Sequence, residues 1–258
     1  MRTKEEIATE LLIDKYLSAP WKLYGVNVNN TESQVKDIFE AEGPEFNSPY
    51  KQILVVCQRG KHGIDYIRQQ VIKILSWGTP TTYFLTKESF EDFLRYYCVS
   101  KKEMVITKFK KENIETDDFN RVCNYLEQLK SLPLQIITKL GRYDVLPQSR
   151  LTVIDNMDPF LDERSPEDKI TQKLTLLQAF KIAAGKSQAT QLILWETEGK
   201  DIEKEIRPEV LKVPDLTLLL QETEKKQVYK LIGYHDIRKR TIEMTLAYDT
   251  QYGLFVEF

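Results

Sequence analysis

The most constraining feature of the sequence is a strand-length apolar run followed at once by a glycine-containing turn and a helical pattern. Residues 51–57 read KQILVVC, residues 58–63 read QRGKHG, and residues 64–78 carry apolar residues at helical spacing. A continuous apolar run of this length is typical of a strand that is buried on both faces of a parallel sheet. The sequence therefore predicts a strand–turn–helix unit in an α/β protein.

The alternation of strand and helix continues along the chain. Further strands are predicted at 81–86, 103–107, 132–138, 150–156 and 189–196, helices at 89–99, 117–132 and 167–185, and four closely spaced strands at 216–222, 227–234, 240–248 and 252–258. Strands that alternate with helices indicate βαβ units and a mostly parallel sheet. The strands near the C-terminus are joined by short turns and indicate an appended antiparallel hairpin.

The first part of the chain has a different character. Residues 4–18 form an amphipathic helical pattern, and Thr3 with Glu6 fits a capping box at its start. We expect residues 1–45 to form an N-terminal helix and arm, and residues 46–258 to form one α/β domain. The N-terminus lacks the apolar core of a signal peptide, and no stretch approaches about 18 apolar residues, so no membrane span is expected. The sequence thus predicts a cytoplasmic protein.

Composition excludes several functional classes. Lys and Arg total 37 against 39 Asp and Glu, which gives a formal net charge of -2 and argues against a surface that is basic throughout; a local basic patch stays open. Cys57, Cys98 and Cys123 are widely spaced and odd in number, which fits a reducing compartment rather than a disulfide scaffold. With two histidines and no CxxC pair, we expect no metal site of the zinc type.

The turn after the first strand is the natural place for an anion, because turn amides and a helix N-terminus meet there. Its residues are Arg59, Gly60, Lys61, His62 and Gly63. The motif GxxxxGK[ST] is not reproduced when Gly60-Lys61 is taken as its Gly-Lys pair, because the first glycine and the hydroxyl then fall on Val55 and His62. Two interpretations stay open: a degenerate phosphate loop, or an ordinary polar connection.

Taken together, these segments resemble the RecA-like motor domain of DnaB-type replicative helicases, with KaiC-like and RadA-like ATPases as relatives. The resemblance covers residues 24–258 and rests on the order and spacing of QILVVCQRGKHGIDY, TTYFLTKESFEDFLRYYCV, LTVIDNMDPF, QLILWET and the strand-rich tail. It implies a RecA-like, mostly parallel sheet flanked by helices, with a C-terminal antiparallel hairpin.

The resemblance also implies roles for individual residues. Asp155, at the end of LTVID, matches the Walker B aspartate. The catalytic glutamate position falls on Lys87, or on Glu88 if the register shifts by one residue. The basic pair that acts on a neighbouring subunit, or contacts DNA, falls within Arg238, Lys239 and Arg240, for which a charged hairpin turn is the alternative interpretation.

These correspondences lead to a functional hypothesis. Phosphoryl transfer needs an amide cradle, a lysine, a magnesium-binding hydroxyl and a water-positioning carboxylate together, and more than one of these is missing from the motifs. We therefore predict a pseudo-ATPase that serves a DNA replication, recombination or mobile-element complex as a structural or regulatory subunit. Its partners would be an active helicase-like relative, other protein subunits or its own copies, with DNA contact left open. No cofactor is expected; residual binding of ATP and Mg²⁺ stays open.

Two alternatives are kept. The first is an atypical but active DNA-dependent ATPase or helicase. The second is a metal-dependent nuclease, because Glu196-Thr197-Glu198-Gly199-Lys200 contains the Glu-x-Lys tripeptide at a strand end. In that case Asp155 and Glu198 would bind the metal ion.

Overall fold

The computed structural model describes residues 51–103, 116–137, 149–163, 165, 168–187, 189–199, 201–236 and 239–257. The predicted N-terminal helix and arm lie outside these residues, as does nearly all of the strand predicted at 103–107. Within the described part of the chain, no helix is both long and apolar enough to cross a membrane.

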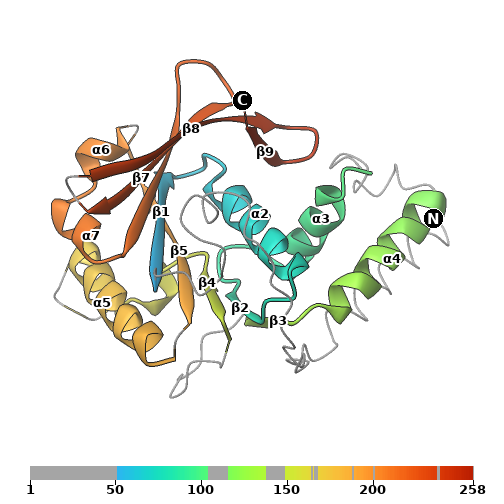
Figure 1. Ribbon diagram of the computed structural model, residues 1–258, viewed down its shortest axis with the longest axis horizontal. Coiled ribbons are helices and arrows are strands. Elements are labelled where there is room, and N and C mark those ends of the chain that lie inside the picture. The colour runs from blue at the N-terminus through green and yellow to red at the C-terminus, as the bar shows by residue number, and fades with distance from the viewer. Residues whose placement is uncertain are drawn as a thin grey trace.

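A nine-stranded mixed sheet forms the centre of the molecule (Figure 1). Its strands are β1 (Gln52–Gln58), β2 (Thr81–Phe84), β3 (Leu134–Ile137), β4 (Leu151–Ile154), β5 (Thr190–Thr197), β6 (Leu216–Glu222), β7 (Val228–Asp236), β8 (Lys239–Asp249) and β9 (Leu254–Glu257). Their order across the sheet is β3-β2-β4-β5-β1-β6-β7-β8-β9. The mostly parallel sheet predicted from the alternating pattern is confirmed.

The sheet changes direction at one point. The strands from β3 to β6 all pair in parallel, whereas β6, β7, β8 and β9 pair in antiparallel fashion. The C-terminal hairpin region predicted from the closely spaced strands is therefore confirmed. Because β5 and β6 lie on either side of β1, the C-terminal ends of these three parallel strands form one edge beside the turn after β1.

Helices cover both faces of the sheet. On one side lie α2 (Gly63–Ser76), α3 (Phe90–Ser100) and α4 (Thr116–Ser131), and on the other lie α5 (Lys169–Ser187), α6 (Ile202–Glu205) and α7 (Pro208–Lys212) (Figure 1). Each side encloses its own hydrophobic core. Alternate residues of β1 supply both cores, and the five residues from Ile53 to Cys57 are fully buried. This is why β1 appears in the sequence as a continuous apolar run.

Two buried glutamines fix α5 on the sheet. Gln52 of β1 and Gln191 of β5 lie opposite one another, and the Gln52 Nε2 atom donates to Gln191 Oε1 at 3.0 Å. The same Nε2 also donates to the Leu177 carbonyl, and Gln191 Nε2 donates to the Phe180 carbonyl.

Helix α5 continues through Gly185 to Ser187, so it ends two residues later than predicted.

Candidate functional site

The turn between β1 and α2 is tight and bonded to itself. The Lys61 N–H donates to the Gln58 carbonyl at 3.1 Å, and the Arg59 N–H donates to the Thr197 carbonyl of β5 at 2.8 Å. Gly60 has φ 75°, a conformation that glycine adopts without strain, and His62 follows with φ 58°. Two turn amides are thus engaged within the protein rather than directed at a ligand.

The ends of β1 and α2 set the register against the phosphate-loop motif. Since β1 ends at Gln58 and α2 begins at Gly63, the two glycines of GxxxxGK[ST] correspond to Gln58 and Gly63. The lysine position then falls on Ile64 and the hydroxyl position on Asp65. In the register with Gly60-Lys61, the first glycine position lies on Val55 inside β1. The start of α2 at Gly63 sets the register given by the ends of β1 and α2, and the sequence placed this start one residue later, at residue 64.

Gly63 is required by packing. A Cβ atom at this position would lie 2.1 Å from the Cys57 Sγ atom and 3.2 Å from a methyl group of Leu194. The first turn of α2 therefore sits directly against β1 and β5. Burial raises the Cys57 pKa to about 12, so this thiol stays protonated and inert at neutral pH.

Both basic side chains of the turn bind carboxylates of the protein. Lys61 Nζ lies 2.6 Å from Glu222 Oε2 at the end of β6. Arg59 Nη1 lies 2.6 Å from Glu198 Oε1, and its other nitrogens lie 3.9 Å from Glu196 and 3.8 Å from Asp158. Lys61 lowers the pKa of Glu222, which keeps this carboxylate charged. The cations that would attract a phosphate are thus neutralised from both neighbouring strands.

Aromatic and charged groups cover the start of α2. His62 stacks on Tyr248 with ring centroids 3.7 Å apart, and its Nδ1 lies 2.8 Å from Asp65 Oδ2. The Tyr248 hydroxyl donates to the same Asp65 oxygen at 2.7 Å, and Arg68 Nη1 donates to Asp65 Oδ1 at 3.1 Å. The Tyr96 hydroxyl donates to the Asp65 carbonyl at 2.9 Å. Three side chains therefore hold the Asp65 carboxylate in place.

Asp155 follows the last residue of β4, as predicted, and is 1% exposed. Its Oδ1 accepts hydrogen bonds from the Thr86 N–H and the Thr86 hydroxyl, both at 2.9 Å, and from the Lys87 N–H at 3.2 Å. Burial raises the Asp155 pKa, while these donors act in the opposite direction. The side chain thus ties the end of β4 to the segment that follows β2.

The two candidates for the catalytic glutamate position are both paired. Lys87 forms an ion pair with Glu196 of β5, whose side chain is 15% exposed. Glu88 forms an ion pair with Arg68 of α2, whose side chain is 7% exposed. Sequence reasoning missed Arg68, Glu196 and Glu222 as partners, because each is one charged residue far away along the chain from the group that it binds.

The start of β8, with Lys239 and Arg240, lies at the end of the sheet opposite the turn. Backbone pairing of Asp236 with Lys239 closes the β7–β8 hairpin. Since β7 pairs from Glu222↔Tyr229 to Thr217↔Tyr234, it runs toward the start of β6 and hence toward the start of β1. Residues 237 and 238 lie outside the described part of the chain. The structure therefore does not bring the start of β8 to the turn after β1 in the same molecule.

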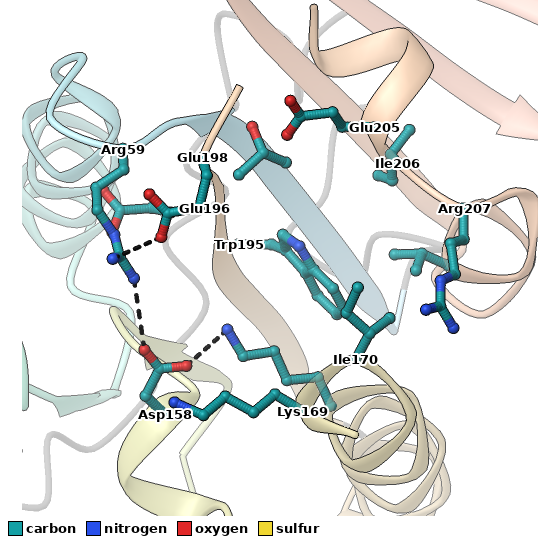
Figure 2. Close-up of a pocket in the computed structure, with 13 residues that line it drawn as sticks. Arg59, Asp158, Lys169, Ile170, Trp195, Glu196, Glu198, Glu205, Ile206 and Arg207 are labelled. Carbon is teal, nitrogen blue, oxygen red and sulfur yellow. Dashed lines mark ion pairs between the residues drawn. The ribbon is translucent and has the colours of Figure 1, made fainter. Parts of the chain in front are cut away.

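A pocket of about 330 Å³ opens on the Arg59 side of the turn (Figure 2). It lies between the C-terminal end of β5, the start of α5, and α6 and α7. Its polar lining includes Arg59, Asp158, Lys169, Lys173, Glu196, Glu198, Glu205 and Arg207, and Trp195, Ile170, Ile206 and Val210 supply apolar surface. Lys173 Nζ lies 2.6 Å from Asp158 and 5.4 Å from the centre of the Trp195 ring. Acidic and basic groups are equally represented, so the lining does not favour a polyanion.

The nuclease alternative gains no support from these positions. Asp155 is buried and bonded to Thr86 and Lys87, whereas Glu198 pairs with Arg59. Across the ranges that the structure describes, no three His, Cys, Asp or Glu residues gather as metal ligands.

Two solved structures resemble the whole chain. One, the structure of an ATPase domain, has 14% sequence identity and a TM-score of 0.68, with 100% of each chain covered. The other, the structure of a DnaB-like replicative helicase and its interactions with primase, has 13% identity and a TM-score of 0.64, with 100% of this chain and 68% of that one covered. The sequence matches no protein-family model and no curated protein.

At these identities the likeness establishes the architecture, and it agrees with the strand order and with the resemblance found in the sequence. The chain has the RecA-like α/β fold, in the form found in the ATPase domains of DnaB-like helicases.

Proposed function

We propose that this chain is a RecA-like domain with little or no ATP hydrolysis that acts as a structural or regulatory subunit of a DNA replication, recombination or mobile-element complex. One observation carries the proposal. At the edge where such a fold would hold a nucleotide, the available charged groups bind one another, through Lys61–Glu222, Arg59–Glu198, Lys87–Glu196 and Arg68–Glu88.

The chemistry of phosphoryl transfer supports this interpretation. A phosphate-loop lysine contributes a positive charge beside the β- and γ-phosphates, and here the position holds Ile64, which is 9% exposed. The magnesium-binding hydroxyl is replaced by Asp65, whose negative charge would repel phosphate. At the position of the water-orienting glutamate stands Lys87, which cannot accept a proton from water while it is charged.

The absence of several such groups at once supports the proposal. Catalytic groups that act as a unit are strongly non-additive, and removal of one member abolishes most of the rate. Ile64, Asp65 and Lys87 at these three positions therefore support a chain with little or no ATP hydrolysis. Asp155 would remain as a buried structural carboxylate.

Titration calorimetry and phosphate release on the full chain test the proposal directly. With ATP and excess Mg²⁺, we expect turnover no faster than that of the Asp155→Asn variant. Weak binding without turnover agrees with the proposal and assigns a residual nucleotide site. Micromolar binding together with turnover that Asp155→Asn abolishes would reject it in favour of the active ATPase.

Assembly with other subunits is the second part of the proposal. The start of β8, with Lys239 and Arg240, lies at the edge of the sheet opposite the turn at Arg59–Gly63. This separation within one molecule supports a contact between the hairpin and a second molecule. We infer that this molecule is a helicase-like relative or another copy, and that residues 46–258 form the assembling domain with residues 1–45 as its arm.

Charge reversal at the hairpin tests this part. The triple variant Arg238→Glu, Lys239→Glu, Arg240→Glu should lower the mass of the assembly measured by light scattering, or release the co-purifying protein. A matched triple reversal at exposed lysines of other segments, Lys102→Glu, Lys186→Glu, Lys212→Glu, should leave both unchanged. Equal behaviour of the two variants would exclude the hairpin as the contact.

A further inference from the structure

The outer face of α5 carries a strip of side chains that is almost free of charge. Ile182 is 63% exposed, more than any other large apolar side chain of the described residues. It belongs to a row of exposed residues spaced four, three and four positions apart: Thr175, Ala179, Ile182 and Lys186. This spacing places the four side chains along one line of the helix, as in the seam between two packed helices.

The first described residue, Lys51, is tied to α5 beside this strip. The Asp215 Oδ2 atom accepts a hydrogen bond from the Lys51 N–H at 2.7 Å. The Asp215 Oδ1 atom lies 2.6 Å from Nζ of Lys181, the residue next to Ile182 in α5. Residues 1–50 therefore connect to the described part of the chain close to the exposed isoleucine.

Helix α5 and the helix predicted at residues 4–18 have complementary charges. Helix α5 contains four lysines and no acidic residue, whereas residues 4–18 contain four acidic and two basic residues. Three of the acidic residues recur at every fourth position: Glu6, Glu10 and Asp14. In a helix this acidic row would run beside Ile7 and Leu11, so the segment would present an apolar surface flanked by negative charge.

A helix over residues 4–18 needs a surface to pack on. Isolated helices shorter than about 12–15 residues are marginal in water, and most of their stability in proteins comes from packing of an apolar face. The strip on α5 suits this role. Thr175 and Ala179 are small enough for a second helix to approach closely, and Ile182 supplies apolar area that would be removed from water.

We propose that residues 4–18 form a helix that docks on the strip of α5 in the same molecule, with Leu11 packed near Ile182. Residues 19–50 are long enough to reach any point of α5, which is about 28 Å long. Since the connection to the described chain lies beside Lys181, the segment has a high effective concentration near its own α5, and this favours it over the segment of a second copy. The contact is separate from the one between molecules proposed above, because it involves neither the β7–β8 hairpin nor the turn after β1.

Thiol labelling of the full chain tests the contact. The thiol introduced by Ile182→Cys should react with a maleimide about tenfold faster when Leu11→Glu is added, because a charge at an apolar contact releases the segment. Adding Ile13→Glu should leave the reaction slow, since Ile13 lies on the other side of the predicted helix. Peptide mass spectrometry distinguishes the label at position 182 from any label on Cys123. Equal rates in all three chains would overturn the proposal.

Hydrogen exchange measures the same contact from the side of the segment. In the native chain, the amides of residues 7–17 should exchange about tenfold more slowly than in Ile182→Glu. Val256→Glu is the matched control, because Val256 is also an exposed apolar residue, at 38%, and lies in β9. It should leave the protection unchanged, and so should dilution of the native chain.

Three results of the exchange experiment would overturn the proposal. Fast exchange of residues 7–17 in the native chain would show that the segment does not dock. Protection that survives Ile182→Glu would place the contact away from α5. Protection that falls on dilution would show that the segment docks on a second copy of the chain.

Discussion

Lys87 and Glu196 form an ion pair that joins the segment after β2 to the end of β5, although 109 positions separate them in the sequence. The Glu196 side chain is 15% exposed. We expect Lys87→Met to lower the free energy of unfolding by about 1–3 kcal/mol, because it leaves a largely buried carboxylate with only the Arg59 guanidinium, 3.9 Å away. Urea denaturation measures the loss.

The double variant Lys87→Met, Glu196→Gln serves as the control for that prediction. It removes both charges, so it should recover at least half of the loss seen with Lys87→Met alone. If the loss in the double variant equals the sum of the losses from Lys87→Met alone and Glu196→Gln alone, the ion pair does not stabilise this edge of the sheet.

Asp155 should give an unusual dependence of stability on pH. Burial raises its pKa above the ordinary value of 3.8. The folded chain therefore binds this proton more tightly than the unfolded chain, and stability from this group falls as pH rises from 3.8 through the raised pKa. In Asp155→Asn the contribution is absent. The melting temperature of the native chain minus that of Asp155→Asn should fall with pH across this interval and level off above it; a difference that rises with pH would contradict the assigned direction.

Gly63 should not tolerate a methyl group. A Cβ atom there would lie 2.1 Å from Cys57 Sγ, so Gly63→Ala should cost about 1–3 kcal/mol of stability. Adding Cys57→Ala removes the sulfur and should recover part of the loss, since the two sites share one contact.

Gly185 provides the matched control for the Gly63 variant. It lies within α5, and the place that an added methyl group would take has open space within 4 Å, so Gly185→Ala should stabilise the chain by about 0.4–1 kcal/mol. Thermal melts of the two alanine variants should shift in opposite directions. A loss of similar size at both positions would point to backbone conformation rather than to the Cys57 contact.

Tyr248 should stabilise the start of α2 through its hydroxyl. Tyr248→Phe keeps the ring on His62 but removes the donor 2.7 Å from Asp65, and a hydrogen bond to a charged group contributes about 1.5–3 kcal/mol. Chemical denaturation should show a loss in this range, against a negligible change for Tyr252→Phe, whose hydroxyl makes a long contact of 3.5 Å with Gln251 on the surface. If Tyr248→Phe leaves the free energy of unfolding unchanged, water replaces the phenol hydroxyl as the donor to Asp65.

The sequence predicted the strands well because most of them are buried on both faces. Strands β1 and β6 are apolar runs that stand out from their polar flanks. The sequence located both strands to within about one residue. The end of α5 was less well located, since Gly185 lies inside the helix and not beyond it. Glycine stops a helix only when the next backbone groups have better partners, and such partners come from the tertiary structure.

The site was only partly predictable for a related reason. The turn at Arg59–Gly63 was predicted from a local pattern, because strand ends and helix starts have local signatures, and Asp155 was predicted from the resemblance to a known family. Their binding partners have none: Tyr248 and Asp65, for example, are 183 positions apart. A single charged or aromatic residue at a strand end looks the same in the sequence whether it meets solvent or a buried carboxylate.

If the β7–β8 hairpin of one copy contacts the turn after β1 of the next, as proposed above, the separation of these two surfaces within one chain has a consequence for stoichiometry. Contacts between unlike surfaces propagate from copy to copy, and they stop only when the chain of subunits closes on itself or meets a subunit that lacks one of the two surfaces. A copy that kept its turn but lost its hairpin would accept a neighbour without passing the contact on. Small amounts of such a copy would therefore terminate growth of the assembly at one end. The mean length of the assemblies would fall as the share of this copy rises.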